Sequence, residues 1–143
     1  MNDILILYYS KNDSTKKMAR AIARGIESSN LASSSIRTVH SDSYKESDDI
    51  LVTKEDLKKC SGMIIGSPTH FGNMAAPLKA FFDSTTDEWF NNTLESKLGG
   101  VFTSTSSMHG GQETTLISMM MPLIHHGMII AGVPYSELSL IHI

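Results

Sequence analysis

Short apolar runs alternate with amphipathic segments along the chain, and this alternation predicts the secondary structure. A continuous β-favouring apolar run is typical of a strand buried on both faces. The runs that predict strands are residues 4–9, 36–40, 63–66, 98–102 and 128–133. Helical periodicity predicts helices over residues 15–27, 53–60, from 77 onward and 112–126. Strands that alternate with helices form a parallel α/β sheet, and right-handed crossovers favour the strand order 2-1-3-4-5.

Residues at the helix ends add local detail. Ser14 is the expected N-cap of the first helix, whose buried face should carry Met18, Ile22 and Ile26. Thr53 is the expected N-cap of the second helix, because acidic residues follow it in the first turn.

Two prolines and a glycine indicate where the later helices begin, break or end. Pro77 suits the first position of a helix. Pro122 should kink or divide the helix over 112–126, since a proline inside a helix costs about 3 kcal/mol. Gly127 is a plausible stop for that helix, and the polar stretch 41–49 reads as a loop.

Length, charge and cysteine content narrow the class of protein. The 143 residues fit one domain, which we place at residues 1–137. The formal net charge is −3. The sequence has no stripe of basic residues that could neutralise the phosphates of a duplex, and this argues against a nucleic-acid partner. The one cysteine, Cys60, forms no intrachain disulfide and fits a reducing, cytoplasmic setting. The first apolar run is too short for a signal-peptide core or a membrane span.

The loop after the first strand has the composition of a phosphate site. It offers side-chain donors from Ser10, Asn12, Ser14 and Thr15, and the following helix directs free backbone N–H groups at the same place. The helix dipole adds about 0.3–1 kcal/mol for an anion, and each hydrogen bond to a charged group adds about 1.5–3 kcal/mol. A solvated polar turn is the alternative, because strand–loop–helix units are common.

Two further strand-end loops suit a planar heterocycle. In the segment 67–74, Pro68 stiffens the turn, Phe71 offers a flat apolar surface, and Gly72 allows close backbone approach. The segment 104–111 is small and rich in donors, so we expect it to line the other side.

Beyond these loops, sequence motifs spread over almost the whole chain carry a family resemblance. The motifs are Leu7-Tyr8-Tyr9-Ser10, Gly66-Ser67-Pro68-Thr69-His70-Phe71-Gly72-Asn73-Met74, Phe102-Thr103-Ser104-Thr105, Gly110-Gly111-Gln112-Glu113-Thr114 and His125-His126-Gly127-Met128. In this order they resemble the WrbA family of flavodoxin-like quinone oxidoreductases, from residue 4 to about residue 137.

The resemblance implies a flavodoxin-like three-layer sandwich and a cytoplasmic homotetramer. It implies that FMN is bound, that NADH or NADPH supplies hydride, and that a quinone is reduced by two electrons. By position, the implied FMN-binding residues are Ser10, Lys11, Asn12, Asp13, Ser14, Thr15, Pro68, Thr69, His70, Phe71, Gly72, Asn73, Ser104, Thr105, Ser106, Ser107, Met108, His109 and Gly110. His125 matches a histidine that approaches the flavin of a neighbouring subunit, and Trp89 matches an aromatic wall of the quinone pocket. The flavin carries the chemistry, so no catalytic side chain is implied.

Several of these residues have simpler explanations. His125 and His126 could serve only to end a helix, where histidine suits the dipole, and Trp89 could serve only in packing. The histidine spacing fits no usual metal-ligand pattern, so we expect no metal. Cys60 has no activating neighbour in sequence and is expected to be inert.

The chain departs from the family pattern at three places. Asn12-Asp13 stands where relatives often carry an aromatic residue and a glycine, although Asp tolerates a left-handed conformation. His70 stands where arginine is usual, so a titratable group replaces a fixed charge. After the last strand, relatives continue with a final helix, which we expect to be missing here, and we expect residues 138–143 to be a non-native tail.

A sheet face without that helix would leave large apolar side chains uncovered, at about 1.5–3 kcal/mol each. We therefore expect this chain to be unstable or prone to aggregation unless another surface covers the face.

Two other functions fit the same sequence. One is a flavodoxin-type electron carrier, which would need a strongly acidic docking face. The other is a non-catalytic oligomerisation module that has kept the fold and lost the flavin.

Overall fold

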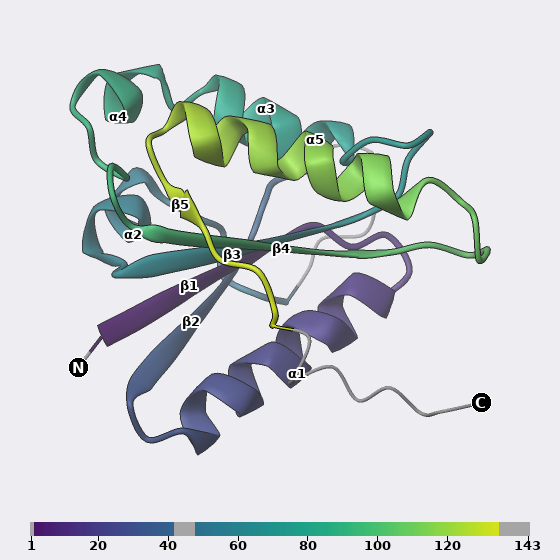
Figure 1. Ribbon diagram of the computed structural model, residues 1–143, viewed down its shortest axis with the longest axis horizontal. Helices are drawn as coiled ribbons and strands as arrows, with labels where there is room; N and C mark the ends of the chain where they lie inside the picture. The colour runs from purple at the N-terminus through teal and green to yellow at the C-terminus, as the bar shows by residue number, and fades with distance from the viewer. Residues whose placement is uncertain (1, 42–47, 135–143) are drawn as a thin grey trace.

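Five parallel strands form one sheet in the order β2-β1-β3-β4-β5, as the sequence predicts. The computed structural model describes residues 2–41 and 48–134 (Figure 1). The strands are β1 (Asn2–Tyr8), β2 (Ala32–Thr38), β3 (Gly62–Pro68), β4 (Leu98–Ser104) and β5 (Ile129–Ile130). Most of the predicted loop over 41–49 and the whole predicted tail over 138–143 lie outside the described residues.

Helices cover both faces of this sheet and make three layers. They are α1 (Ser14–Ser28), α2 (Lys54–Lys59), α3 (Ala76–Asp83), α4 (Thr86–Phe90) and α5 (Gln112–His125). Helix α1 packs on one face, and α3 and α5 lie across the other (Figure 1). The flavodoxin-like three-layer arrangement that the resemblance implies is therefore present.

Strand β1 divides two apolar cores. Leu5 and Leu7 point into the core below α2, α3 and α5, and Ile6 and Tyr8 point into the core below α1. Each of these four side chains is buried, because successive side chains of a strand point to opposite faces. The continuous apolar run in the sequence thus reflects a strand covered on both sides.

Helix α1 differs from the prediction at its start and on its buried face. Asp13, not Ser14, is the N-cap; it has φ 62° and its side chain makes no capping hydrogen bond. The expectation for Met18 is also wrong, since its side chain is 37% exposed while Ala19 and Ala23 are buried. Small side chains at these positions let the helix approach the sheet closely, which periodicity alone does not indicate.

The structure confirms the predictions for the ends of the other helices at Thr53, Pro77 and Gly127. Thr53 is the N-cap of α2, as predicted, and the structure adds that it forms a full capping box with Asp56. Pro77 lies in the first two positions of α3. Pro122 lies in the last turn of α5 and does not divide the helix. Its nitrogen carries no hydrogen, so the helix lacks one hydrogen bond at this position. Gly127 follows the end of α5 with φ 77°, which confirms the predicted stop.

Element lengths were predicted less well at the sheet edges. Strand β2 begins at Ala32, inside a serine-rich stretch that carries no strand pattern, because backbone pairing with β1 holds it from Asn2 onward. Strand β5 is only two residues long, and the short helix α4 was not predicted.

An apolar patch lies on the α1 face of β4 and β5. Leu98 shares a face with Phe102, which packs against α1, and it is register partner of Ile129. Leu98 and Ile129 are each 56% exposed, and Val133 is also exposed.

We expect this patch to drive self-association of the 143-residue chain. Replacing Leu98→Glu together with Ile129→Glu should shift sedimentation velocity profiles toward monomer, because carboxylates resist burial between copies. Leu31→Glu, at an isolated exposed leucine, is the matched control and should change nothing. A monodisperse, cooperatively unfolding monomer of the unmodified chain would contradict the expectation.

The sheet also requires a glycine beneath Phe102. A Cβ at Gly66 would lie 2.1 Å from Phe102 Cζ, so Gly66→Ala should destabilise the fold by about 1–3 kcal/mol in chemical denaturation. Adding Phe102→Leu should recover part of this loss. Gly25→Ala is the control: nothing lies within 4 Å of its Cβ, so this helical position should gain about 0.4–1 kcal/mol. Equal effects of the two alanine variants would refute the packing explanation.

Candidate functional site

The carboxyl ends of β1, β3 and β4 meet at one edge of the sheet, on the right in Figure 1. The segments that follow them enclose a cavity of about 240 Å³, which we call the cradle. Its lining residues are Ser10, Lys11, Asn12, Ser14, Thr15, Pro68, Thr69, His70, Ser104, Thr105 and Ser106. The three polar segments that the sequence analysis selected are therefore brought together in space.

The first segment presents uncompensated hydrogen-bond donors to the cradle. Ser10 Oγ is buried and has no hydrogen-bond partner among the described residues. The first intrahelical bond of α1 runs from Lys17 N to Asp13 O, and Asp13 adds no side-chain cap. Ser14 and Thr15 thus stand where helix N–H groups lack intrahelical partners. Such a helix start favours an anion.

Direct hydrogen bonds hold the three segments in register. Thr15 Oγ1 lies 3.0 Å from Ser104 Oγ, which joins the first segment to the third. Thr69 N donates to Ser104 O at 2.9 Å, which joins the second segment to the third. Thr103 Oγ1 donates to Ser67 O at 2.7 Å just below them. The cradle is therefore a connected unit.

The second segment ends in a tight turn that projects an aromatic side chain. His70 and Asn73 exchange backbone hydrogen bonds at 2.9 and 3.1 Å. Between them, Phe71 has φ 53° and Gly72 has φ 73°, so both central residues are left-handed. The Phe71 side chain is fully exposed. A bulky residue held in this conformation stores strain, which is frequent at ligand sites.

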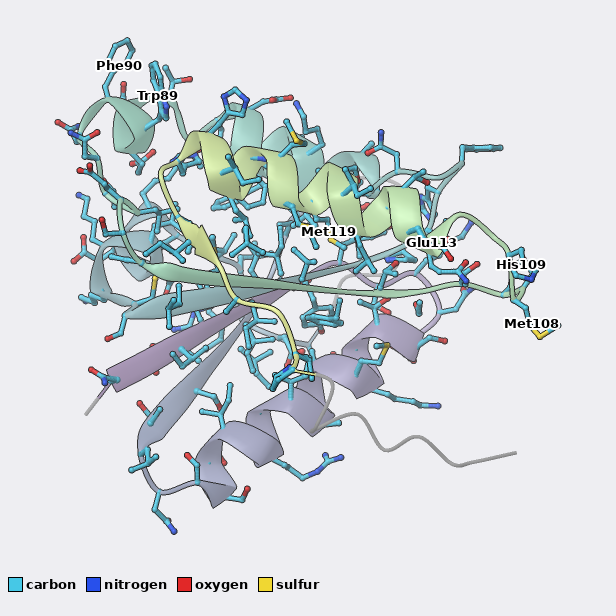
Figure 2. All side chains as sticks on the ribbon, in the orientation of Figure 1. Trp89, Phe90, Met108, His109, Glu113 and Met119 are labelled. Atoms are coloured by element: carbon cyan, nitrogen blue, oxygen red, sulfur yellow. The ribbon has the colours of Figure 1, made fainter. Side chains whose placement is uncertain are left out.

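The third segment contributes only its first part to the cavity. Ser104, Thr105 and Ser106 line it, whereas Met108 and His109 lie at the far tip of the loop (Figure 2). Gly110 closes this loop, since a Cβ there would lie 2.1 Å from Thr105 Oγ1. Ser107 is exposed beside the tip. The proposed roles of the tip residues remain predictions.

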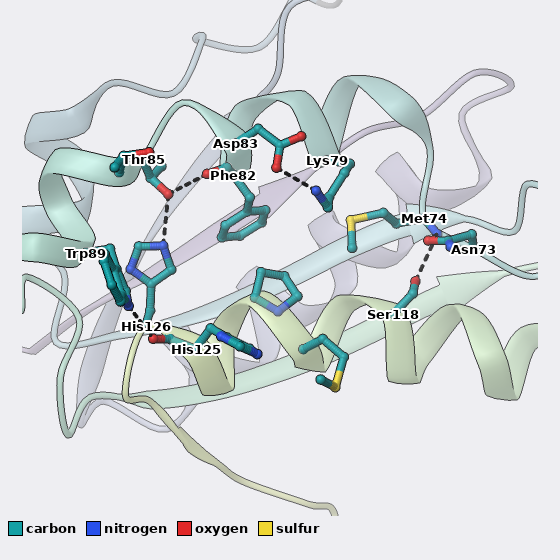
Figure 3. A pocket seen from close by; sticks show the side chains of 13 residues that line it. Asn73, Met74, Lys79, Phe82, Asp83, Thr85, Trp89, Ser118, His125 and His126 are labelled. Atoms are coloured by element: carbon teal, nitrogen blue, oxygen red, sulfur yellow. Dashed lines mark hydrogen bonds and ion pairs between the residues drawn. The ribbon is translucent and has the colours of Figure 1, made fainter.

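Trp89 lies on α4, at the opposite end of the molecule from the loop tip with Met108 and His109 (Figure 2). His125 is the last residue of α5. Both residues line a cavity different from the cradle, of about 560 Å³, between α3, α4 and α5. Trp89 Nε1 donates to His125 O at 2.8 Å, so the two residues are fixed to each other (Figure 3). The same cavity reaches Asn73 and Met74 of the second segment, but neither Trp89 nor His125 lines the cradle.

Buried His126 anchors this second cavity. Thr85 Oγ1 donates to Phe82 O at 2.6 Å, so it accepts from His126 Nε2–H at 2.8 Å (Figure 3). His126 Nδ1 is buried without a hydrogen-bond partner among the described residues. Burial lowers the pKa of His126, and the nearby Glu88 carboxylate opposes this only in part. The imidazole is therefore neutral at pH 7, and Glu88 forms its ion pair with Lys54 at 3.2 Å.

Two cavities beside the cradle were not anticipated from the sequence. One, of about 660 Å³, contains Tyr9, His40 and Ser41 and shares His70 with the cradle. The other, of about 340 Å³, lies on α1 and is lined by Asp13, Lys16, Lys17, Arg20 and Arg24. The cavity on α1 could have been anticipated from the sequence, because its cations recur at helical spacing.

Residues 2–41 and 48–134 contain neither a candidate metal centre nor a candidate membrane span. Within those ranges, no three His, Cys, Asp or Glu side chains are grouped as metal ligands would be. In the same ranges, no helix combines the length and apolar character needed to cross a bilayer.

Comparisons with known proteins agree with this geometry. A family model described as NADPH-dependent FMN reductase matches residues 3–139. A protein of Chromohalobacter salexigens named NAD(P)H dehydrogenase (quinone) is 40% identical, over 95% of this chain and 73% of its own length. A protein of the same name from Paracoccus denitrificans is 42% identical, over 95% and 70%.

Solved structures match the fold. A WrbA-like flavodoxin from Agrobacterium tumefaciens superposes with a TM-score of 0.74 at 24% identity, over 90% of this chain and 76% of that chain. A flavodoxin from the domain Archaea superposes with a TM-score of 0.71 at 26% identity, over 90% and 78%. With a family model matched along nearly its whole length, the chain belongs to the NADPH-dependent FMN reductase family.

Proposed function

We propose that the protein is an FMN-dependent NAD(P)H:quinone oxidoreductase. The observation that carries the proposal is the cradle, in which three strand-end segments surround one cavity. The names of relatives at 40% and 42% identity support the reaction. Bound FMN would accept hydride from NAD(P)H and pass two electrons to a quinone, and the protein would bind and orient the reactants.

The first segment fits the phosphate of FMN. Ser10 Oγ needs a hydrogen-bond partner, and the first turn of α1 offers backbone N–H groups beside it. Lys11 brings a cation to the same lining. Each hydrogen bond to the charged phosphate would stabilise the complex by about 1.5–3 kcal/mol. Asp13 acts against this, although its left-handed backbone turns the chain into the helix.

The second and third segments fit the ribityl chain and the ring. We propose that residues 68–73 and 104–110 contact these parts of FMN. The exposed Phe71, held in a strained turn, offers an apolar face to a planar ring. His70, which also lines the cradle, would place its imidazole near the ring.

The quinone wall would come from a neighbouring subunit. Trp89 and His125 do not line the cradle of their own chain, although the cavity that they share extends to Asn73 of the second segment. In a homotetramer of the WrbA type, this cavity would face the flavin of another copy. Trp89 would then wall the quinone pocket, and His125 would approach the flavin, as the resemblance implies.

A cytoplasmic location completes the proposal. Cys60 is buried, and burial is the main cause that raises the pKa of its thiol. Such a thiol is poorly nucleophilic and compatible with a reducing compartment.

A flavodoxin-type electron carrier is the second candidate, because the archaeal flavodoxin shares the fold. A carrier that is loaded with FMN should show almost no NADH oxidation with benzoquinone, whereas an oxidoreductase turns over steadily. A non-catalytic oligomerisation module should bind no FMN at all.

Removal of the Ser10 hydroxyl tests the phosphate site. Ser10→Ala should weaken FMN binding by about tenfold or more, the factor given by one lost hydrogen bond to a charged group. Fluorescence titration of the apoprotein with FMN measures this. Ser61→Ala, at an exposed serine at the opposite ends of the strands, is the control and should bind FMN like the unmodified protein. Equal affinities for all three proteins would contradict the assignment of the cradle.

The buried His126 gives the Trp89–His125 cavity a pH dependence. Since the folded pKa of His126 is lowered, the unfolded chain binds the proton first as pH falls. The contribution of His126 to the free energy of unfolding is thus complete above the unfolded pKa of about 6.5. Below that pH it decreases, by at most about 1.4 kcal/mol per pH unit.

Denaturation curves at pH 7.5 and pH 5.5 test this dependence. The stability difference between the two pH values should be smaller in His126→Gln than in the unmodified chain. His109→Gln, which removes a histidine at the exposed loop tip, should retain the full difference. An unchanged difference in His126→Gln would show that another group titrates.

A further inference from the structure

The outer face of α1 carries a basic pocket that the cradle does not use. Its volume is about 340 Å³, and Lys16, Lys17, Arg20 and Arg24 line it together with Asp13. These four cations are a third of the 12 Lys and Arg residues in a chain of net charge −3. Positive charge is therefore concentrated in this pocket, although the net charge of the whole protein is negative.

Most of this charge is uncompensated. Arg20 forms an ion pair with Asp49, and Asp13 contributes one carboxylate to the lining. The side-chain nitrogens of Lys16, Lys17 and Arg24 form no ion pair or hydrogen bond with any residue in the described ranges. The pocket thus retains a net positive charge in the folded protein.

The helix itself disfavours two of these cations. Lys16 and Lys17 lie in the first turns of α1, where the positive end of the helix dipole repels them. Acidic residues, which would stabilise such a helix start, are absent from the first turn of α1. Helix stability does not explain this arrangement, whereas an anionic ligand does.

The basic pocket adjoins the cradle. Ser14 and Thr15 line the cradle, and Asp13, Lys16 and Lys17, their neighbours in the same turns of α1, line the basic pocket. A dinucleotide whose nicotinamide reaches the flavin ring extends its adenosine end onto protein surface outside the cradle. A cationic pocket beside the phosphate segment is suited to the charged part of that end.

We propose that the basic pocket of α1 binds the 2′-phosphate of NADPH and makes the protein prefer NADPH to NADH. This inference rests on the proposed oxidoreductase function. The 2′-phosphate is the only group by which the two dinucleotides differ, and a phosphate monoester carries about −1.5 to −2 charges at pH 7. Lysine and arginine are the side chains that recognise such a group.

Binding of nucleotide fragments tests the site without any turnover. The FMN-loaded protein is titrated calorimetrically with adenosine 2′,5′-bisphosphate and with 5′-AMP. The bisphosphate should bind at least tenfold more tightly, the factor for one charge-assisted hydrogen bond, and its affinity should fall as salt is raised. Equal affinities for the two fragments would overturn the proposal.

A matched pair of double variants locates the site. Lys17→Gln with Arg24→Gln should remove about tenfold of the bisphosphate affinity and raise KM for NADPH by a similar factor. KM for NADH and kcat with either dinucleotide should stay within twofold. Lys58→Gln with Lys59→Gln removes the same charge from exposed lysines of α2 and should change none of these values.

Other outcomes separate the possible failures. Equal losses for NADPH and NADH, or a loss of FMN affinity alone, would overturn the proposal, since the cations would then serve the flavin or the fold. If quinone reduction is absent with both dinucleotides while the bisphosphate still binds and the α1 variant weakens it, the site stands and the oxidoreductase function fails.

Discussion

Parallel hydrogen bonding between β1, β3 and β4 is the constraint on which the site depends. Because neighbouring strands run in the same direction, the chain leaves each of them at the same edge of the sheet. The three segments that leave there are polar, and hydrogen bonds such as Thr15–Ser104 and Thr69–Ser104 join them. No loop builds the cradle alone; the pairing of strands distant in sequence builds it.

Helix α1 has two tasks that require different residues. Ala19 and Ala23 bring it close to the sheet, and that contact fixes where its first turn stands. Its first turn can then direct unpaired N–H groups into the cradle. Its outer face remains free to carry Lys16, Lys17 and Arg24 without cost to the core. Helix α1 thereby joins the cradle on one side to a cationic pocket on the other.

Helices α3, α4 and α5, on the other face of the sheet, surround the cavity that contains Trp89, His125 and His126. His126 is held neutral and buried between Thr85 and Phe82, and this fixes the end of α5 against α3 and α4. Trp89 is attached to the same end through His125 O. The cavity behind these residues extends from Trp89 and His125 to Asn73 of the second strand-end segment.

The sequence by itself determined the strand order, the two-sided burial of β1, the capping box of Thr53 and the polar segments of the cradle, since each follows from local periodicity or turn chemistry. Only tertiary structure decided that Ala19 rather than Met18 faces the sheet, that Phe71 is left-handed in a closed turn, and that Trp89 joins His125. These features depend on contacts between residues distant in the chain, whose energies exceed local preferences and leave no pattern in a single segment.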